Sequence, residues 1–283
     1  MTTTPSFVPP RPLLVGATAS DPANSVAIWN AIRSWFVEHG LPFEYALFAT
    51  YDGLCGALLR GEVDIAWNAP MAHAQALLVS DGACRTLAMR DTDQNVRSLL
   101  LARTSSGITS PADLVGRRVA LGVATSSELR LVPVHELRAR GLDLETQCEL
   151  VDLEPRTYGN GAHWIDDRLL FDALLAGEAD AVALFEPWLA PLTKRRGVAA
   201  EDLTILWASE PYCHCAFTAR PGLARQTANR FVELLLAMDP AEPAVGEMMR
   251  LEHLTRWLPA QEGGWTTLMT AIDAAGLRGA TFV

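Results

Sequence analysis

The feature that most constrains the fold is a pattern that occurs twice, in residues 58–66 and again in residues 174–182. The two stretches read LLRGEVDIA and LLAGEADAV. In each, a helix end is followed by a glycine, which suits the left-handed conformation at a helix C-terminus, and then by a small apolar run suited to a buried strand. Each run then stops at a proline, Pro70 or Pro187. The repetition indicates one α/β unit used twice, and it predicts two similar lobes with a cleft between them.

Strands and helices are expected to alternate along both halves of the chain. The first half begins with a strand from Leu13 to Thr18, a helix to about His39 and a strand from Phe43 to Phe48. Such alternation with short loops predicts parallel strands covered by helices on both faces. We therefore predict an α/β protein with two Rossmann-like lobes, each with a central mixed sheet, joined by a two-segment hinge. The expected lobes are residues 1–100 plus 216–283 for lobe 1 and residues 101–215 for lobe 2.

Charge and composition exclude several classes of protein. The 283 residues carry a formal net charge of −10, and 49% of them are hydrophobic. An acidic chain has no general affinity for nucleic acid or anionic membrane, and this apolar content is enough for a full core. No apolar run reaches the length of about 18 residues that predicts a membrane span. The five cysteines are odd in number, so a disulfide framework is not expected.

The first residues bear on where the protein works. They contain no basic residue before Arg11 and no long apolar segment. Because they do not read as a secretory signal, a cytoplasmic location is expected, or a periplasmic one if a signal segment has been removed.

Candidate ligand-binding residues follow the predicted strands, because ligands of open α/β sheets bind beyond the carboxyl ends of the strands. The ends of the first-lobe strands include Arg90 and the aromatic Trp67, where a core strand would normally stay aliphatic; Trp67 could also simply fill the core. The expected ligand-binding set is Tyr51, Trp67, Asn68, Thr125, Ser126, Ser127, Tyr158, His163, Glu186 and Tyr212.

The most specific of these signals is the run Thr125, Ser126, Ser127 at a predicted strand-to-helix junction. Hydroxyls and backbone amides at a helix N-terminus can donate to an oxyanion, in the positive field of the helix end. The alternative is that one of the three hydroxyls merely caps the helix.

The loop from Tyr158 to Trp164 carries two glycines, an aromatic, an amide and His163 before a helix. Glycines allow a loop to approach a ligand, and His163 could bind an anionic group or transfer a proton. Glu186 could bind a ligand amine or act as a base. The alternative interpretations are an exposed turn for the loop and a solvated carboxylate for Glu186.

A metal site is suggested by Tyr212-Cys213-His214-Cys215, but only weakly. A zinc site needs further ligands at short spacing, and the chain has no Cys-x-x-Cys or His-x-x-x-His. We expect Cys213 and Cys215 to line the hinge or the cleft, and we expect neither a metal nor a cofactor. No glycine-rich phosphate loop of a nucleotide-binding type occurs either.

Five patterns, in order along the chain, resemble the phosphonate-binding family of periplasmic-binding-protein-like proteins. They are residues 58–69, residues 113–120, the hydroxyl cluster with residues 131–133 after it, residues 177–181 and residues 206–212. The resemblance covers about residues 12 to 222. It implies a type 2 binding-protein fold, in which two α/β lobes close on a small anion. In that family the hydroxyl cluster holds the phosphonate or phosphate, which here implies Thr125, Ser126 and Ser127. Aromatic side chains cover the ligand, and their counterparts here are Tyr51 and Trp67.

Three functions are open at this point. The first is a substrate-binding protein that clamps a small anionic metabolite (a phosphonate, phosphate, sulfonate or carboxylate) between its lobes, with an ABC permease as partner if the protein is exported. The second is a cytoplasmic enzyme on the same scaffold, a decarboxylase, dehydratase or related lyase, with His163, Glu186 and His214 as candidate catalytic residues beside Tyr158. The third is a ligand-sensing module for a partner protein.

Overall fold

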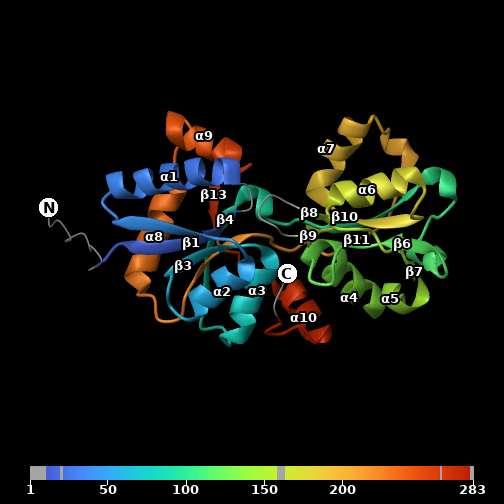
Figure 1. Cartoon of the computed structure of the whole chain (residues 1–283), viewed down its shortest axis with the longest axis horizontal. Helices are drawn as coiled ribbons and strands as arrows, with labels where there is room; N and C mark the ends of the chain where they lie inside the picture. Colours follow the sequence, from blue (N-terminus) through green and yellow to red (C-terminus); the bar gives the residue numbers. More distant parts are fainter. Residues whose placement is uncertain (1–10, 20–21, 158–162, 262, 281–283) are drawn as a thin grey trace. The chain divides into compact units, whose positions relative to one another are not determined.

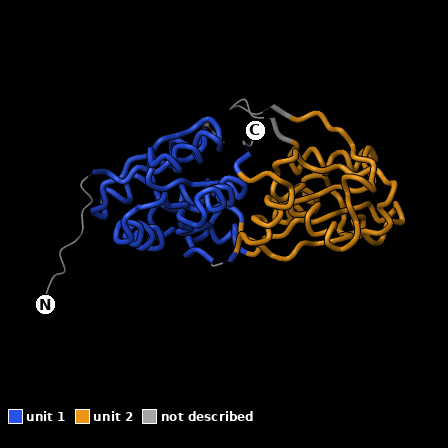
Figure 2. Tube along the Cα trace, turned by 90° about the horizontal axis from the view of Figure 1, so that it is seen from below, with its two compact units in different colours: residues 1–94, 214–263, 279–282 blue, residues 95–213, 264–278, 283 orange. Residues whose placement is uncertain are grey.

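The computed structural model describes residues 11–19, 22–157, 163–261 and 263–280. These residues form two compact units, shown in blue and orange in Figure 2. Unit 1 contains residues 1–94, 214–263 and 279–282, and unit 2 contains residues 95–213 and 264–278.

Unit 1 is built on a six-stranded mixed sheet in the order β13-β4-β12-β3-β1-β2. Strands β1, β2 and β3 are parallel, whereas β12 runs antiparallel to both β3 and β4. The carboxyl ends of the first four strands therefore share one edge with the start of β12. The strands are β1 (Leu13–Thr18), β2 (Phe43–Phe48), β3 (Ile65–Asn68), β4 (Arg85–Arg90), β12 (Ala216–Ala219) and β13 (Trp257–Pro259).

Helices cover both faces of this sheet, with α1 and α9 on one face and α2 and α3 on the other (Figure 1). The core between sheet and helices is rich in aromatic rings: Phe36 stacks on both Phe43 and Phe231, at centroid distances of 4.8 and 5.0 Å. The helices are α1 (Pro22–Glu38), α2 (Tyr51–Leu59), α3 (Pro70–Val79), α8 (Arg225–Leu236) and α9 (Pro243–Leu251).

Unit 2 is built on a five-stranded mixed sheet in the order β11-β5-β10-β6-β7. Strand β10 is parallel to β6 and antiparallel to β5. Helices α6 and α7 lie on one face and α4 and α5 on the other (Figure 1). The strands are β5 (Ser98–Arg103), β6 (Arg118–Ala120), β7 (Glu149–Leu150), β10 (Ala181–Phe185) and β11 (Leu203–Ala208), with a small hairpin of β8 (Arg156–Thr157) and β9 (His163–Trp164). The helices are α4 (Val132–Ala139), α5 (Leu144–Gln147), α6 (Asp167–Ala176), α7 (Glu186–Arg196) and α10 (Thr266–Ala274).

The repeated sequence has the same local structure in both units. Gly61, one residue beyond the cap of α2, and Gly177, the cap of α6, both have φ +74°, where a side chain would be strained. The aspartate before each strand then makes the same bonds. Asp64 bonds to both backbone groups of Leu14, through its amide at 2.8 Å and its carboxylate at 3.1 Å, and Asp180 bonds to those of Arg118 at 2.8 and 3.0 Å. In both copies of the repeat, the aspartate therefore joins the new strand to the neighbouring strand by hydrogen bonds.

The C-terminal helix differs from its expected place. The sequence predicts residues 216–283 as a whole in the first lobe, but α10 packs on α4 and belongs to unit 2. Its buried side chains Leu268, Ala271 and Ile272 supply the apolar face for this packing.

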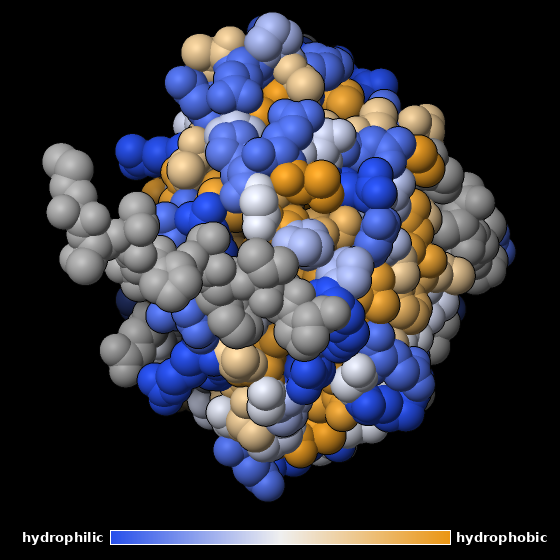
Figure 3. Space-filling view, turned by 90° about the vertical axis from the view of Figure 1, so that its left-hand side faces the viewer, coloured by the Kyte–Doolittle hydropathy of each residue, from blue (hydrophilic) through white to orange (hydrophobic). Residues whose placement is uncertain are grey.

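Exposed hydrophobic side chains are scattered. In unit 1 they include Val26 and Val37, which are both about half exposed. Figure 3 shows one side of the molecule, where hydrophilic and hydrophobic residues are mixed. Scattered exposure of this kind is normal for a folded protein.

Candidate functional site

The hydroxyl cluster of unit 2 lies where β6 leads into a helix. A π-helical turn, Ser127–Leu131, begins there and continues directly into α4. Ser126 caps this turn, because its Oγ accepts a hydrogen bond from the amide of Leu129 at 3.3 Å. Gly122 allows the loop to approach, since a Cβ at this position would be 2.6 Å from the Cβ of Leu129. The capping alternative therefore holds for Ser126.

Ser127 is different from its neighbour. Its side chain is only 2% exposed, and its Oγ has no hydrogen-bond partner among the described residues. A buried hydroxyl without a partner costs free energy, so such a group needs an explanation. Thr125, the third member of the cluster, is half-buried in the loop just before the cap.

Acidic side chains surround this part of unit 2. Burial, with the nearby charge of Glu128, raises the pKa of the Asp167 carboxyl to about 7, although the amide of Phe185 donates to it at 2.7 Å and opposes the rise. Burial also raises the pKa of the Tyr212 phenol, again helped by Glu128 and Asp167. Tyr212 is fully buried, and its hydroxyl bonds to Ser98 Oγ at 2.9 Å. At neutral pH, Asp167 is therefore poised between its charged and neutral forms.

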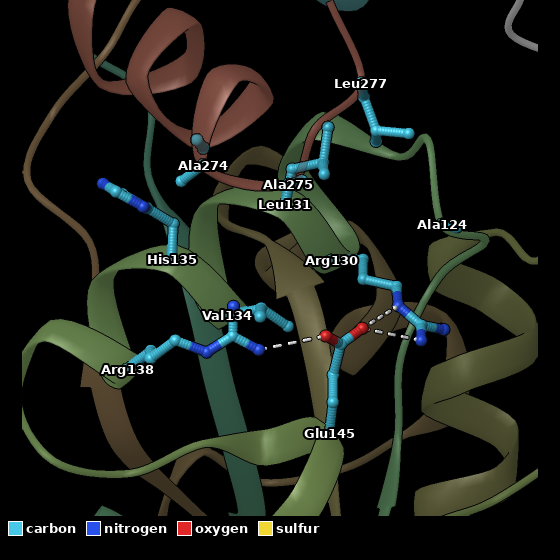
Figure 4. A pocket seen from close by; sticks show the side chains of 11 residues that line it. Ala124, Arg130, Leu131, Val134, His135, Arg138, Glu145, Ala274, Ala275 and Leu277 are labelled. Carbon is cyan, nitrogen blue, oxygen red and sulfur yellow. Dashed lines mark hydrogen bonds and ion pairs between the residues drawn. The ribbon is translucent and has the colours of Figure 1, made fainter. Parts of the chain in front are cut away.

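Two hollows lie beside the hydroxyl cluster within unit 2. One has a volume of about 430 Å3 and is lined by residues that follow β6 and β7, among them Gly122, Ala124 and Asp152. The other, of about 300 Å3, lies between α4 and α10 and is shown in Figure 4. Arg130 lines both.

The two arginines of the second hollow share one carboxylate, that of Glu145. Glu145 accepts from Arg130 at 2.9 Å and from Arg138 at 3.1 Å, as Figure 4 shows. Burial, and then the charge of Arg138, lowers the pKa of His135. The arginines are thus held in place by a carboxylate, and an anion in this hollow would compete with Glu145 for them.

In unit 1, aromatic and charged side chains gather at the carboxyl edge of the sheet. Tyr51 opens α2 and hydrogen-bonds Thr18 at the end of β1, and burial raises the pKa of its phenol. Trp67, in β3, is half-buried, and the guanidinium of Arg90 lies over its ring at 5.3 Å from the centroid. Tyr51, Trp67 and Arg90, which were predicted from their positions at or after strand ends, thus lie at one edge of the sheet.

Arg90 is held by two carboxylates. It donates to Asp93 through Nε at 2.5 Å and Nη2 at 3.0 Å, and to Glu252 through Nη1 at 3.3 Å. Burial opposes the charge of Asp93, but hydrogen bonds from His214 and Arg90 outweigh it and lower the pKa of this carboxyl to about 2. Burial is the main cause that raises the pKa of Glu252. Sequence reasoning missed Asp93 and Glu252, because neither directly follows a strand of the parallel set.

Asn68 is fully buried rather than exposed at the sheet edge. Its Nδ2 donates to Thr218 Oγ1 at 2.9 Å, and the same hydroxyl contacts His73 Nδ1 at 2.7 Å. Burial lowers the pKa of His73 to about 3, so this imidazole is neutral. The geometry gives Asn68 a place in a polar network of the core, and its role in ligand binding stays a prediction.

The remaining predicted residues come from separate segments of the chain. Tyr158 lies outside the described residues, and His163 is placed only by its backbone, in β9. Glu186 is the first residue of α7 and is exposed. His214 lies just before β12 and contacts Asp93. Their proposed binding and catalytic roles stay predictions.

Comparison with known proteins identifies the fold and the family. PhnD1 from Prochlorococcus marinus, in complex with methylphosphonate, is 15% identical with a TM-score of 0.69, over 95% of this chain and 100% of that chain. The periplasmic aliphatic sulphonate binding protein SsuA from Escherichia coli is 15% identical with a TM-score of 0.58, over 95% of this chain and 89% of that chain. These likenesses confirm the predicted α/β fold with two mixed sheets.

The family model described as ABC transporter, phosphonate, periplasmic substrate-binding protein matches residues 15–264. This match confirms the resemblance seen in the sequence. It gives no support to the enzyme alternative or to a cytoplasmic location. Among the described residues, no helix is long and apolar enough to cross a membrane. The chain belongs to the family of periplasmic substrate-binding proteins of phosphonate ABC transporters.

Proposed function

We propose that this protein binds a phosphonate, or a related small anion such as phosphate, a sulfonate or a carboxylate, and delivers it to an ABC permease. The family supports this proposal, and so do two proteins of similar fold, PhnD1 in complex with methylphosphonate and SsuA, named for aliphatic sulphonates. By the same reasoning we propose a periplasmic location, which fractionation of cells that express the natural gene would test.

The anionic group is bound at the start of the helix that opens with Ser127. The observation that carries this assignment is the buried Ser127 Oγ, which has no partner among the described residues. A phosphonate oxygen would accept from this hydroxyl and relieve its cost, and the first amides of a helical run offer further donors. Ser126 supports the site indirectly, because its side chain already caps the turn.

The acidic surroundings add a pH dependence to this proposal. An anion near Asp167 and Glu128 disfavours the charged form of Asp167, whose pKa already lies near 7. Binding should therefore be accompanied by proton uptake, and affinity should rise as the pH falls from about 8 to about 6. Equal affinity across this range would show that the anion binds away from these carboxyls.

Calorimetry of the Ser127→Ala variant tests the assignment. Losing one hydrogen bond to a charged group costs roughly 1.5–3 kcal/mol, so affinity for methylphosphonate should fall by roughly ten- to 150-fold. The matched control is Ser106→Ala, in the same unit, where an exposed hydroxyl donates to the carbonyl of Arg103 at 2.6 Å. The control should bind as the unaltered protein does. Unchanged affinity in Ser127→Ala would overturn the assignment, whereas no binding of any tested anion by the unaltered protein would overturn the proposed function itself.

A further inference from the structure

Three side chains with metal-binding atoms meet in unit 1, although they come from distant parts of the chain. Asp93 ends the short turn after β4, and His214 and Cys215 directly precede β12. Because β12 runs antiparallel to β4, the end of one strand lies beside the start of the other. The amide of His214 donates to the carbonyl of Asp93 at 2.8 Å and fixes the two segments to each other.

The donor atoms are spaced as metal ligands are. His214 Nδ1 lies 3.2 Å from Asp93 Oδ1 and 3.2 Å from Cys215 Sγ, and all three donor atoms lie within 4.8 Å of one another. A tetrahedral ion at about 2.0 Å from nitrogen or oxygen and about 2.3 Å from sulfur separates N–O pairs by about 3.3 Å and N–S pairs by about 3.5 Å. Both separations from His214 Nδ1 are within a few tenths of an ångström of these values, and the Asp93 oxygen and Cys215 Sγ, within 4.8 Å of each other, would close on the ion.

The site is enclosed and its carboxylate is already oriented. Asp93 is 2% exposed and Cys215 is 9% exposed, so neither is a loose surface group. Arg90 donates hydrogen bonds to both oxygens of Asp93, as outer partners of ligating carboxylates commonly do. The positive charge of Arg90 disfavours a cation, but the negative charges of Asp93 and of a Cys215 thiolate offset it.

We propose that Asp93, His214 and Cys215 bind a divalent ion of intermediate softness such as Zn2+, with a fourth position open to water or to a ligand group. Thiolate and imidazole select such ions over Mg2+ or Ca2+, which prefer oxygen alone. Binding requires the thiolate, so it releases a proton from the thiol. Cys213, the residue that the sequence suggested as a partner of Cys215, is not part of the cluster.

Cobalt substitution tests the proposal directly, because Co2+ bound by a thiolate gives a charge-transfer absorption that other ligands do not produce. Reduced, metal-free full-length protein should bind one equivalent of Co2+ with this band, and Zn2+ should displace it. Cys215→Ser should abolish the band. The matched control is Cys148→Ser, which removes a thiol outside the cluster and should leave the band unchanged. The experiment is independent of the anion, so its outcome is separate from the proposed function.

His214→Gln gives a second test that does not depend on the folding of the cysteine variant. Loss of the imidazole should weaken Co2+ binding at least about tenfold, since even loss of an outer partner commonly costs that much. The proposal is overturned if the unaltered protein shows no thiolate band, if the band persists in Cys215→Ser, or if His214→Gln binds as tightly as the unaltered protein.

Discussion

Replacing the aspartate of each sequence repeat tests how much burial changes the stability that the same hydrogen bonds supply. Asp64 has a nearly buried side chain, 4% exposed, that bonds to Arg11 at 2.7 Å, to Arg220 at 3.0 Å and to the amide of Leu14. Asp180 makes the corresponding bond to the amide of Arg118 and pairs with the same residue's guanidinium, but its side chain is 23% exposed.

The expected costs follow from this difference in burial. In Asp64→Ala, the 25% exposed Arg220 guanidinium and the Leu14 amide both lose a buried carboxylate, and a hydrogen bond to a charged group is worth roughly 1.5–3 kcal/mol. In Asp180→Ala, an ion pair with the 41% exposed Arg118 is worth about 0.2–1 kcal/mol and the amide bond adds about 0.5–1.5 kcal/mol. We therefore expect the Asp64 variant to lose at least about 1 kcal/mol more of its free energy of unfolding than the Asp180 variant.

Urea denaturation at pH 7, followed by circular dichroism, measures both costs. The folded-state pKa of Asp64 is lowered, mainly by Arg11, Leu14 and Arg220, which outweigh the opposing effect of burial. The stability that it supplies is thus complete above its unfolded pKa of about 3.9, and it is lost as the pH falls through the lower, folded value. The difference between Asp64→Ala and the unaltered protein should shrink in that acidic window. Equal costs for the two variants at pH 7 would refute the argument from burial.

Two further predictions concern single positions. The raised pKa of Asp167, about 7, means that its neutral form favours the folded state, so this group's contribution is complete below about pH 4 and is lost as the pH rises to about 7. Asp167→Asn should remove this loss, and parallel melting curves from pH 4 to 8 would contradict it. At Gly16, a Cβ would collide with the fully buried Leu54 and lie 3.1 Å from Phe48. Gly16→Ala should cost roughly 1–3 kcal/mol, and a Gly40→Ser control, with open space at its Cβ but φ +78°, should lose stability through backbone strain alone. Calorimetric melting compares the two, and an unchanged Gly16 variant would show that Leu54 can repack.

The fold was predictable because its main signals are local. Glycine at the two helix ends and aspartate three residues later fix where each helix stops and each strand begins, and the structure repeats these contacts in both units. The position of α10 was not predictable in this way. Its apolar face shows that it packs on something, but only the folded chain shows that the partner is α4.

The candidate site was predictable only in part, because only some of its residues are marked by local sequence patterns. Strand ends marked Tyr51, Trp67 and Arg90, and hydroxyls at a helix start marked Ser127. Asp93 joins His214 from 121 positions away, so no rule of short metal-ligand spacing could find it. The predicted closure of two lobes on a ligand is a matter of long-range arrangement and stays a prediction.

A crystal structure of the protein with methylphosphonate would show whether the anion binds at Ser127. Ser127 Oγ should lie about 2.7 Å from a phosphonate oxygen, the usual length of an O–H···O bond, with amides at the start of the same helix directed at the anion. A phosphonate bound elsewhere, with Ser127 Oγ still without a partner, would contradict this assignment.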